Sequence, residues 1–182
     1  MTSITERYLS AAATSSLKVE AEKSTDVDII IAAGFAVRDN ARKALALKLL
    51  RARESGRLSE VHTIAGALAA MLYGRGKQGK HHLAARGQQI CKDDSKAVAY
   101  RVMRWWINPT CRACNGLKHA TMVNAPVLDT ATVCPACNGS GMAPLENVVP
   151  HKHAENARWM VSEIESLIAM TVSSVSRRLH AN

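Results

Sequence analysis

Residues 111–141 read CRACNGLKHATMVNAPVLDTATVCPACNGSG, and this stretch opens and closes with the same Cys-x-x-Cys-Asn-Gly pattern. Four of the five cysteines in the 182-residue chain lie in it. A gap of two residues lets a tight turn bring both sulfurs of a pair to one metal ion, and two such turns, or knuckles, complete a tetrahedral thiolate site. The spacing therefore predicts one metal site, whose four ligands are Cys111, Cys114, Cys134 and Cys137.

The expected ion is zinc in a structural role, because four sulfur ligands leave no open position for water. The same four sulfurs also suit iron, so the identity of the ion is open at this stage. Free cysteines and a catalytic dithiol are the alternatives, but the Asn-Gly tail is duplicated and redox sites usually carry a single Cys-x-x-Cys. Gly116 and Gly139 are expected to take a positive φ in the two turns. Cys91, the fifth cysteine, is expected at a helix end rather than in the site.

The positive charge of the chain is concentrated beside these cysteines. The net charge is +9, and residues 57–118 hold eleven Lys or Arg against three Asp or Glu. A segregated basic block favours phosphate, because Lys and Arg contacts release the counterions of nucleic acids. A solvated basic face is the alternative interpretation. The candidate nucleic-acid contacts are Lys77, Lys80, Arg86, Lys96, Arg101, Arg104, Arg112 and Lys118.

The composition predicts a mainly α fold. Apolar residues make up 47% of the chain but aromatic residues only 4%, a balance that favours helices over a β-sandwich. A small sheet around the cysteines is compatible with it. The longest apolar run, residues 29–37, is short compared with the ~20 residues of a membrane-spanning helix. With no secretory signal at the N-terminus, we expect a cytoplasmic protein without a membrane partner.

The apolar pattern predicts where the helices lie. A stripe of one residue in three or four indicates a helix from an N-cap at Thr25 to about Arg53, with Gly56 as its stop. Ser59 is expected to cap a second helix over 60–73. The pattern then predicts a flexible basic loop (73–82), a short helix (82–90), a turn (91–94), a helix (95–107) ended by Asn108-Pro109, and an amphipathic C-terminal helix (154–179).

Four regions follow from this pattern: an N-terminal arm (1–24), a basic helical domain (25–110), a four-cysteine module of zinc-ribbon-like form (111–141), and a linker with the C-terminal helix (142–182). The helices at 82–90 and 95–107 fit either a helix-turn-helix or an ordinary antiparallel pair. In a helix-turn-helix the second would enter the major groove of DNA. Arg101 and Arg104, three residues apart, would then leave the same side of that helix.

An enzyme is not expected. A nuclease with paired Cys-x-x-Cys knuckles needs a His with nearby acids to hold Mg²⁺ and activate water, and only His119 and Asp129 stand between these knuckles. No Ser-His-Asp set, phosphate-binding glycine loop or paired carboxylate site is visible. A non-catalytic scaffold that binds RNA or a protein partner stays open beside the DNA-binding interpretation.

Two known families resemble parts of the chain. CPACNGSG (134–141) is similar to the C-x-x-C-x-G-x-G repeat of the DnaJ-type zinc domain, although CRACNGLK (111–118) has Lys118 at the last glycine position. This resemblance implies a DnaJ-like zinc cofactor as a third functional alternative. The layout over about residues 24–141 resembles the Q-type late antiterminators of lambdoid phages, which are small, basic, mainly helical and carry one pair of knuckles. That resemblance implies a protein that binds duplex DNA near a late promoter, joins a paused RNA polymerase and makes it resistant to terminators.

Overall fold

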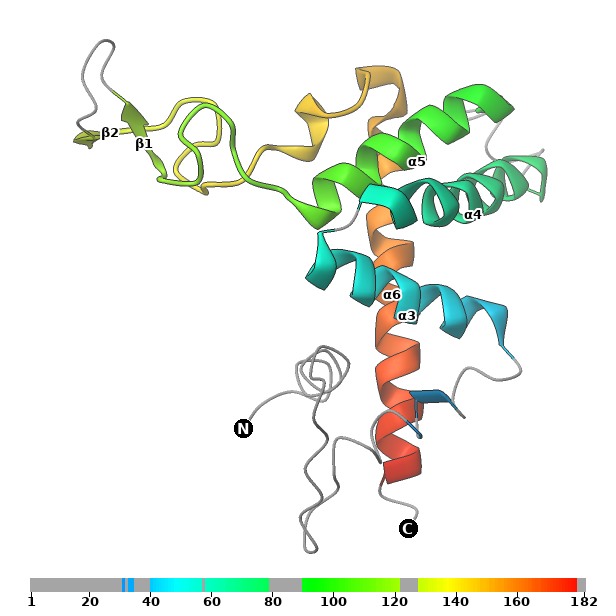
Figure 1. Cartoon of the computed structure of the whole chain (residues 1–182). Coiled ribbons are helices and arrows are strands. Elements are labelled where there is room, and N and C mark those ends of the chain that lie inside the picture. The colour runs from blue at the N-terminus through cyan, green and yellow to red at the C-terminus, as the bar shows by residue number, and fades with distance from the viewer. Residues whose placement is uncertain are drawn as a thin grey trace, which may run out of the picture. The chain divides into compact units, whose positions relative to one another are not determined.

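The computed structural model describes residues 31, 33–34, 40–56, 58–78, 90–121 and 128–179. In this part of the chain the fold is mainly helical, with a four-cysteine module of zinc-ribbon-like form between α5 and α6 and a long C-terminal helix (Figure 1). This confirms the predicted fold class. The chain divides into two compact units, Met1–Glu60 with Ser162–Asn182, and Val61–Val161. None of the described helices is both long and apolar enough to cross a membrane.

The first labelled helix, α3 (Ala41–Ser55), corrects the prediction of one helix from Thr25 to about Arg53. Asn40 is extended, with φ −140°, and its side chain accepts hydrogen bonds from the backbone N–H groups of Arg42 and Lys43. This N-cap satisfies donors that an unbroken helix would have paired with its preceding turn, so a new helix begins here. Gly56 ends α3 as predicted, in the left-handed conformation with φ +60°.

Helix α4 (Leu58–Gln78) is longer at both ends than the predicted 60–73. Ser59 lies inside it rather than capping it, and residues 73–78 of the predicted loop are helical. Apolar rows hold the helix together through burial, so its glycines are tolerated although each lowers helix propensity. The fully buried side chains of α4 are Val61, Ile64, Leu68 and Leu72. The end of the predicted loop and the short helix at 82–90 lie outside the described residues.

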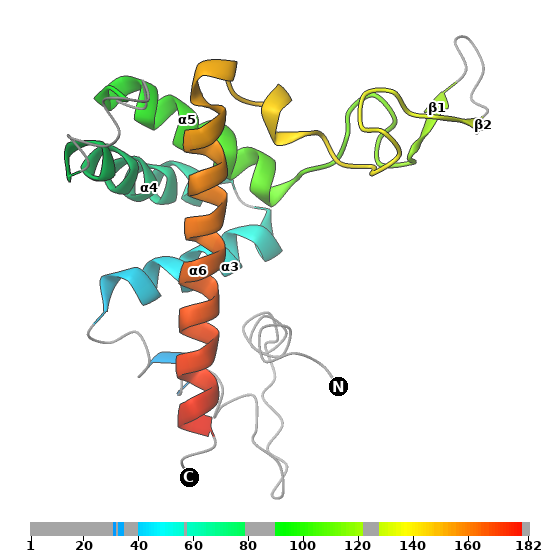
Figure 2. The same ribbon diagram turned by 180° about the vertical axis from the view of Figure 1, so that it is seen from behind.

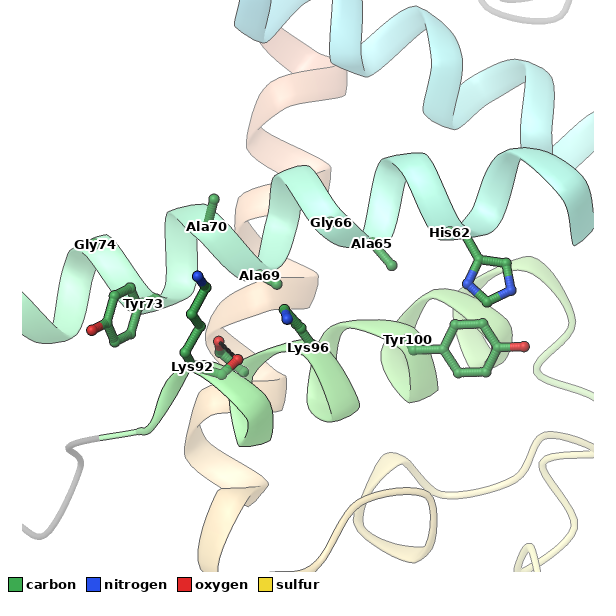
Figure 3. A pocket seen from close by; sticks show the side chains of 11 residues that line it. His62, Ala65, Gly66, Ala69, Ala70, Tyr73, Gly74, Lys92, Lys96 and Tyr100 are labelled. Carbon is green, nitrogen blue, oxygen red and sulfur yellow. Dashed lines mark hydrogen bonds between the residues drawn. The ribbon is translucent and has the colours of Figure 1, made fainter.

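Helix α5 (Lys92–Ile107) runs antiparallel to α4, so that His62 faces Tyr100 and Tyr73 lies near Lys92 (Figure 3). The two facing rings, His62 and Tyr100, stack with their centroids 4.9 Å apart. The predicted turn at 91–94 is instead the first turn of α5, because Cys91 acts as the N-cap. Asn108 is the C-cap, as the Asn-Pro pair predicts.

Helix α6 (Ala154–Leu179) has the predicted bounds and is the long helix seen from both sides in Figures 1 and 2. The segment before it is not an extended linker. Pro144 and Pro150 each precede a short 3-10 turn, Leu145–Asn147 and His151–His153. Within the Val61–Val161 unit, the guanidinium of Arg75 on α4 lies 4.8 Å from the ring centroid of Trp159 on α6, a cation–π contact between the two helices.

A two-stranded antiparallel sheet joins the knuckles, as the composition allowed. Strand β1 (His119–Thr121) pairs with β2 (Leu128–Val133), and the register shifts at a bulge between His119 and Ala120. In both views the strands lie at the end of the module away from α5 (Figures 1 and 2). The sheet therefore pairs the segment that leaves the first knuckle with the segment that enters the second.

Candidate metal centre

The four predicted cysteines come together in one buried cluster. Their Sγ atoms all lie within 4.8 Å of one another, and the Sγ atoms of Cys114 and Cys137 are 3.7 Å apart. Tetrahedral zinc with Zn–S bonds of about 2.3 Å sets sulfur–sulfur distances of about 3.8 Å. No cysteine of the cluster is more than 3% exposed. The donor set and its spacing thus fit one four-coordinate metal ion.

The two knuckles are built alike and are related by an approximate twofold repeat of hydrogen bonds. The N–H of Cys111 donates to the carbonyl of Gly141, and the N–H of Cys134 donates to the carbonyl of Lys118, both at 2.9 Å. The two acceptors are at equivalent positions: Gly141 lies seven residues after Cys134, and Lys118 lies seven residues after Cys111. Backbone hydrogen bonds therefore connect the two knuckles, in addition to the shared cluster of sulfurs.

Left-handed backbone explains the duplicated Asn-Gly tail. Gly116 and Gly139 have φ of +82° and +75°, as predicted, and Asn115 and Asn138 precede them with φ of +47° and +50°. Asn tolerates this region better than most side chains do. Lys118, where the first knuckle lacks its second glycine, has φ +69°, close to the +78° of Gly141. Lys118 thus takes the same left-handed turn as Gly141, at the expense of backbone strain.

The glycine at the end of the second knuckle is enforced by space as well as by φ. A Cβ added to Gly141 would lie 2.9 Å from the carbonyl oxygen of Gly116. A Cβ on Gly139 would lie 2.9 Å from a methyl group of Val133. These contacts explain why the tail of the second knuckle reads Gly-Ser-Gly.

The pKa values of Cys114 and Cys137 are shifted in opposite directions. Burial raises the pKa of Cys114 to about 11 against a hydrogen bond from the backbone of Lys118, and the hydrogen bonds to the other three sulfurs also raise it. Burial also opposes ionisation of Cys137, but hydrogen bonds from the Gly141 N–H and the other thiols outweigh it and lower its pKa to about 7. The Gly141 N–H lies 3.4 Å from this sulfur. Because thiolates rather than thiols bind a metal ion, binding at this site releases protons.

The module is tied to α5 where the chain enters and leaves it. Thr110 and Met142 form an isolated antiparallel bridge, and the N–H of Ala143 donates to the carbonyl of Pro109 at 2.7 Å. The indole N–H of Trp105 donates to the carbonyl of Ala143, also at 2.7 Å. The last turn of α5 is therefore hydrogen-bonded to the segment through which the chain leaves the module.

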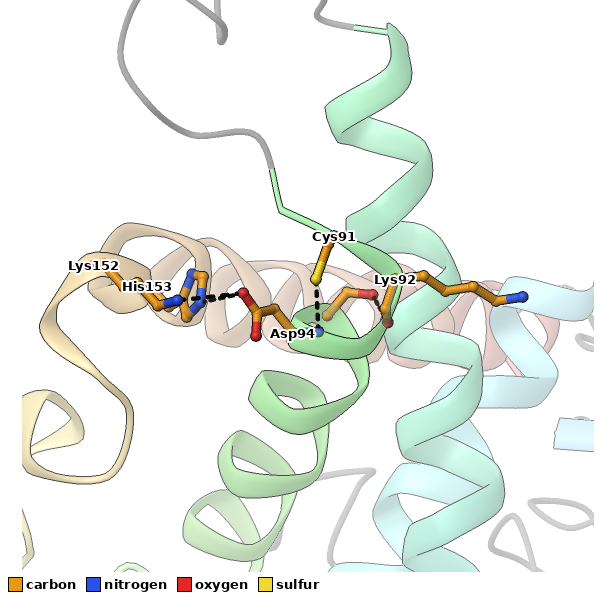
Figure 4. A network of polar contacts seen from close by, with 6 residues as sticks. Cys91, Lys92, Asp94, Lys152 and His153 are labelled. Carbon is orange, nitrogen blue, oxygen red and sulfur yellow. Dashed lines mark hydrogen bonds and ion pairs between the residues drawn. The ribbon is translucent and has the colours of Figure 1, made fainter.

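A polar network at the start of α5 was missed by sequence reasoning (Figure 4). The Sγ of Cys91 accepts the N–H of Asp94 at 3.3 Å, which confirms its predicted place at a helix end. The Asp94 carboxylate lies 3.4 Å from the Lys152 ammonium and 3.2 Å from Nε2 of His153, which is buried. Burial alone would raise the pKa of Asp94, but the charges and hydrogen bonds of Lys152 and His153 lower it. No local signal could have joined residues this far apart in sequence.

The structure describes six of the eight predicted nucleic-acid contacts, and these lie on α4, α5 and the first knuckle. Arg101 and Arg104 are exposed on α5, and the Arg104 guanidinium lies 5.9 Å from the ring centroid of Tyr100. Arg112 and Lys118 are exposed on the first knuckle. Lys96 instead lines a groove between α4 and α5 and lies 3.7 Å from Asp93. Of the remaining three, Lys77 falls within α4, whereas Lys80 and Arg86 lie outside the described residues.

The residues of the nuclease alternative lie on the small sheet. His119 is paired with Val133, and Asp129 with Ala120. Nδ1 of His119 is buried and has no hydrogen-bond partner among the described residues. Leu117, Val133 and Met142 around the knuckles are each about half exposed. The surface of the module is thus partly apolar.

No known protein family, curated protein or solved structure matches this chain.

Proposed function

We propose that this chain is a zinc-stabilised DNA-binding protein, and not an enzyme, that acts on transcription. The observation that carries the proposal is the exposed pair Arg112 and Lys118 on a closed four-cysteine site. A buried four-sulfur site has a structural use, because it leaves the ion no position for a substrate or a reactive water. The basic side chains that it fixes on its surface are suited to phosphate.

Helix α5 supplies the second part of the proposed interface. Arg101 and Arg104 stand in its exposed half, whereas Val98 and Val102 are buried. An exposed helix that carries arginines is suited to the major groove, where arginine pairs with two acceptors of guanine. We assign base reading to Arg101 and phosphate contact to Arg112 and Lys118. Lys96 contributes less, because it lines the α4–α5 groove.

Salt-dependent binding to duplex DNA tests the proposal. Each phosphate contact adds nearly one unit to the slope of log affinity against log salt, so Arg112→Ala and Lys118→Ala should each lower that slope for every sequence. Arg101→Ala should relax the preference at one base pair, by roughly 1–3 kcal/mol. Arg178→Ala is the matched control, since it removes an exposed arginine near the C-terminal end of α6. Binding that ignores salt, or three variants that match the control, would refute the proposal.

The resemblance to Q-type antiterminators supports the finer proposal that this protein joins RNA polymerase and makes it resistant to terminators. In transcription reactions with purified polymerase, the protein should increase readthrough of a terminator only when the template carries its DNA site. Readthrough that is unchanged on every template would leave a DNA-binding protein without this activity.

The partly apolar knuckle surface favours a second candidate, a scaffold that binds RNA or a protein. Leu117 stands on the first knuckle where the second has the polar Ser140. A single-stranded RNA of matched length should compete poorly with duplex DNA if the first proposal holds. If the RNA wins that competition, the scaffold function replaces it.

A further inference from the structure

A groove of about 710 Å³ lies between the antiparallel helices α4 and α5, and neither the metal centre nor the proposed DNA contacts of the knuckle use it (Figure 3). Its floor is formed by small residues of α4, with Ala65 and Ala69 buried at the bottom. The stacked rings of His62 and Tyr100 close one end, and Tyr73 stands at the other. The shape is an elongated apolar trough along one helix.

Two glycines in this groove have no structural reason within the described residues. Gly66 and Gly74 lie inside α4, and a Cβ added to either would meet nothing within 4 Å. Neither has a positive φ. Glycine at such a position lowers the stability of a helix by about 1 kcal/mol relative to alanine. Gly66 and Gly74 each lower the stability of α4 along the same trough. A molecule that approaches the α4 backbone closely would explain why both positions are glycine.

The spacing of the small residues fits a helix as that molecule. Gly66, Ala70 and Gly74 recur every four residues on α4. The i±4 rows of a helix form the ridges that pack into the grooves of a second helix. Removing side chains along one such row leaves a channel of about 12 Å from Gly66 to Gly74, at 1.5 Å per residue, which accommodates about two helical turns.

The charge of the residues that line the groove indicates which side chains a docked helix would carry. Lys92 and Lys96, one turn apart on α5, line the trough, and no Asp or Glu among the described residues does so. Lys96 lies 3.7 Å from Asp93, but both side chains are well exposed, so the pair holds the lysine weakly. A second copy docked through this face would set lysines against lysines. A nucleic acid would place phosphates over an apolar floor.

We propose that the α4–α5 groove is the docking site for an amphipathic helix of a protein partner, with carboxylates one turn apart facing Lys92 and Lys96. Its apolar ridge would lie over Gly66, Ala70 and Gly74, with the Tyr73 and Tyr100 rings at the two ends. The site shares Lys96 with the predicted DNA contacts, but it uses neither Arg112 nor Lys118, on which the proposed DNA-binding function rests.

A displayed library of helical peptides, randomised on one face, tests the site against the full-length protein with its metal bound. Peptides selected on the wild type should converge on an apolar stripe flanked by two acidic residues one turn apart. Their affinity, measured by fluorescence anisotropy, should fall at least about 100-fold in Gly66→Leu, whose side chain fills the trough. Thermal unfolding of this variant should not be weakened, because leucine favours a helix more than glycine does.

Two further variants make the result decisive. Ala97→Leu places the same side chain on an exposed position of α5 outside the groove and should leave peptide affinity unchanged. Lys92→Glu with Lys96→Glu should reverse the charge preference, so that basic versions of the selected peptides bind better than acidic ones. Selected peptides that bind wild type and Gly66→Leu equally would overturn the site, and selection of basic or uncharged peptides would overturn the assigned partner.

Discussion

The helical pair α4–α5 and the four-cysteine module are stabilised in different ways. The helices bury branched side chains such as Ile64, Leu68 and Val102. Among the described residues of the module, the buried cluster consists of the four cysteines, while Leu117 and Val133 remain about half exposed. Burial of apolar area therefore stabilises the first region, whereas sulfur ligation and backbone geometry stabilise the second. The same residue type, glycine, accordingly has opposite consequences in the two.

The largest expected effect is the loss of the metal ion, which should unfold the four-cysteine module but leave the helical pair folded. Cys134→Ser should abolish binding of one zinc ion per chain and unfold the module, because ligation in small zinc sites contributes about 10–16 kcal/mol. The helical signal in circular dichroism should largely persist. Metal analysis together with spectra recorded with and without a chelator measures both. Cys91→Ser is the control: Cys91 caps α5 and is not a predicted ligand, so this variant should still bind the ion.

If Cys134→Ser retained a full equivalent of metal, the assignment of the four ligands would be wrong. Iron in place of zinc would keep the site but correct the ion. Loss of the helices together with the module would show that the two regions fold as one cooperative unit, and the comparison would then fail.

The next effect concerns glycine in the two regions. Gly141→Ala should destabilise the metal-bound module by roughly 1–3 kcal/mol, because the left-handed φ and the Gly116 carbonyl both oppose a Cβ. Gly66→Ala should stabilise the helical region by up to about 1 kcal/mol. Denaturant unfolding of the two variants measures both changes. Shifts of the same sign in both variants would contradict the distinction.

A smaller effect is expected where the two knuckles differ. Lys118→Gly should stabilise the module by roughly 0.5 kcal/mol, since it relieves a left-handed lysine although it loosens the unfolded chain. Arg112→Gly removes the same charge without a positive φ to relieve, and should destabilise by roughly 0.5–1 kcal/mol. Competition with a metal chelator ranks the two variants. If the Arg112→Gly variant resisted the chelator better than the Lys118→Gly variant, the backbone of Lys118 would not be strained.

The smallest effect lies at the start of α5 and depends on pH. The pKa of Asp94 is lowered in the folded chain, so its contribution to stability is present above the ordinary value of 3.8 and is lost as the pH falls through the lowered folded pKa. Asp94→Asn should therefore unfold more easily than the wild type near neutral pH. The difference should vanish in acid. A difference independent of pH would contradict the ion-pair origin.

How far the sequence predicts the structure depends on how local the cause is. The cysteine ligands, the positive φ of Gly116 and the bounds of α6 follow from short spacings and periodic patterns. The break at Asn40 was missed because the apolar stripe continued through it, while the cap depends on side-chain hydrogen bonds. The length of α4 was missed because glycines at 74 and 76 indicate a loop when packing is unknown.

Contacts between distant segments could not be predicted from local patterns. The pairing of Asp94 with His153 joins residues 59 positions apart, and the groove exists only once α5 lies along α4. One signal for the groove was nevertheless present in the sequence. Small residues at 66, 70 and 74 recur at the spacing of a helical row, which marks a face open to a close neighbour.

The bridge between Thr110 and Met142 makes the module an interchangeable cassette. The chain enters and leaves at adjacent points, where the Ala143 N–H meets the Pro109 carbonyl at 2.7 Å. Everything between these points can therefore be exchanged for a tight turn, or for a knuckle pair from another protein, without changing the distance that the helical scaffold must span.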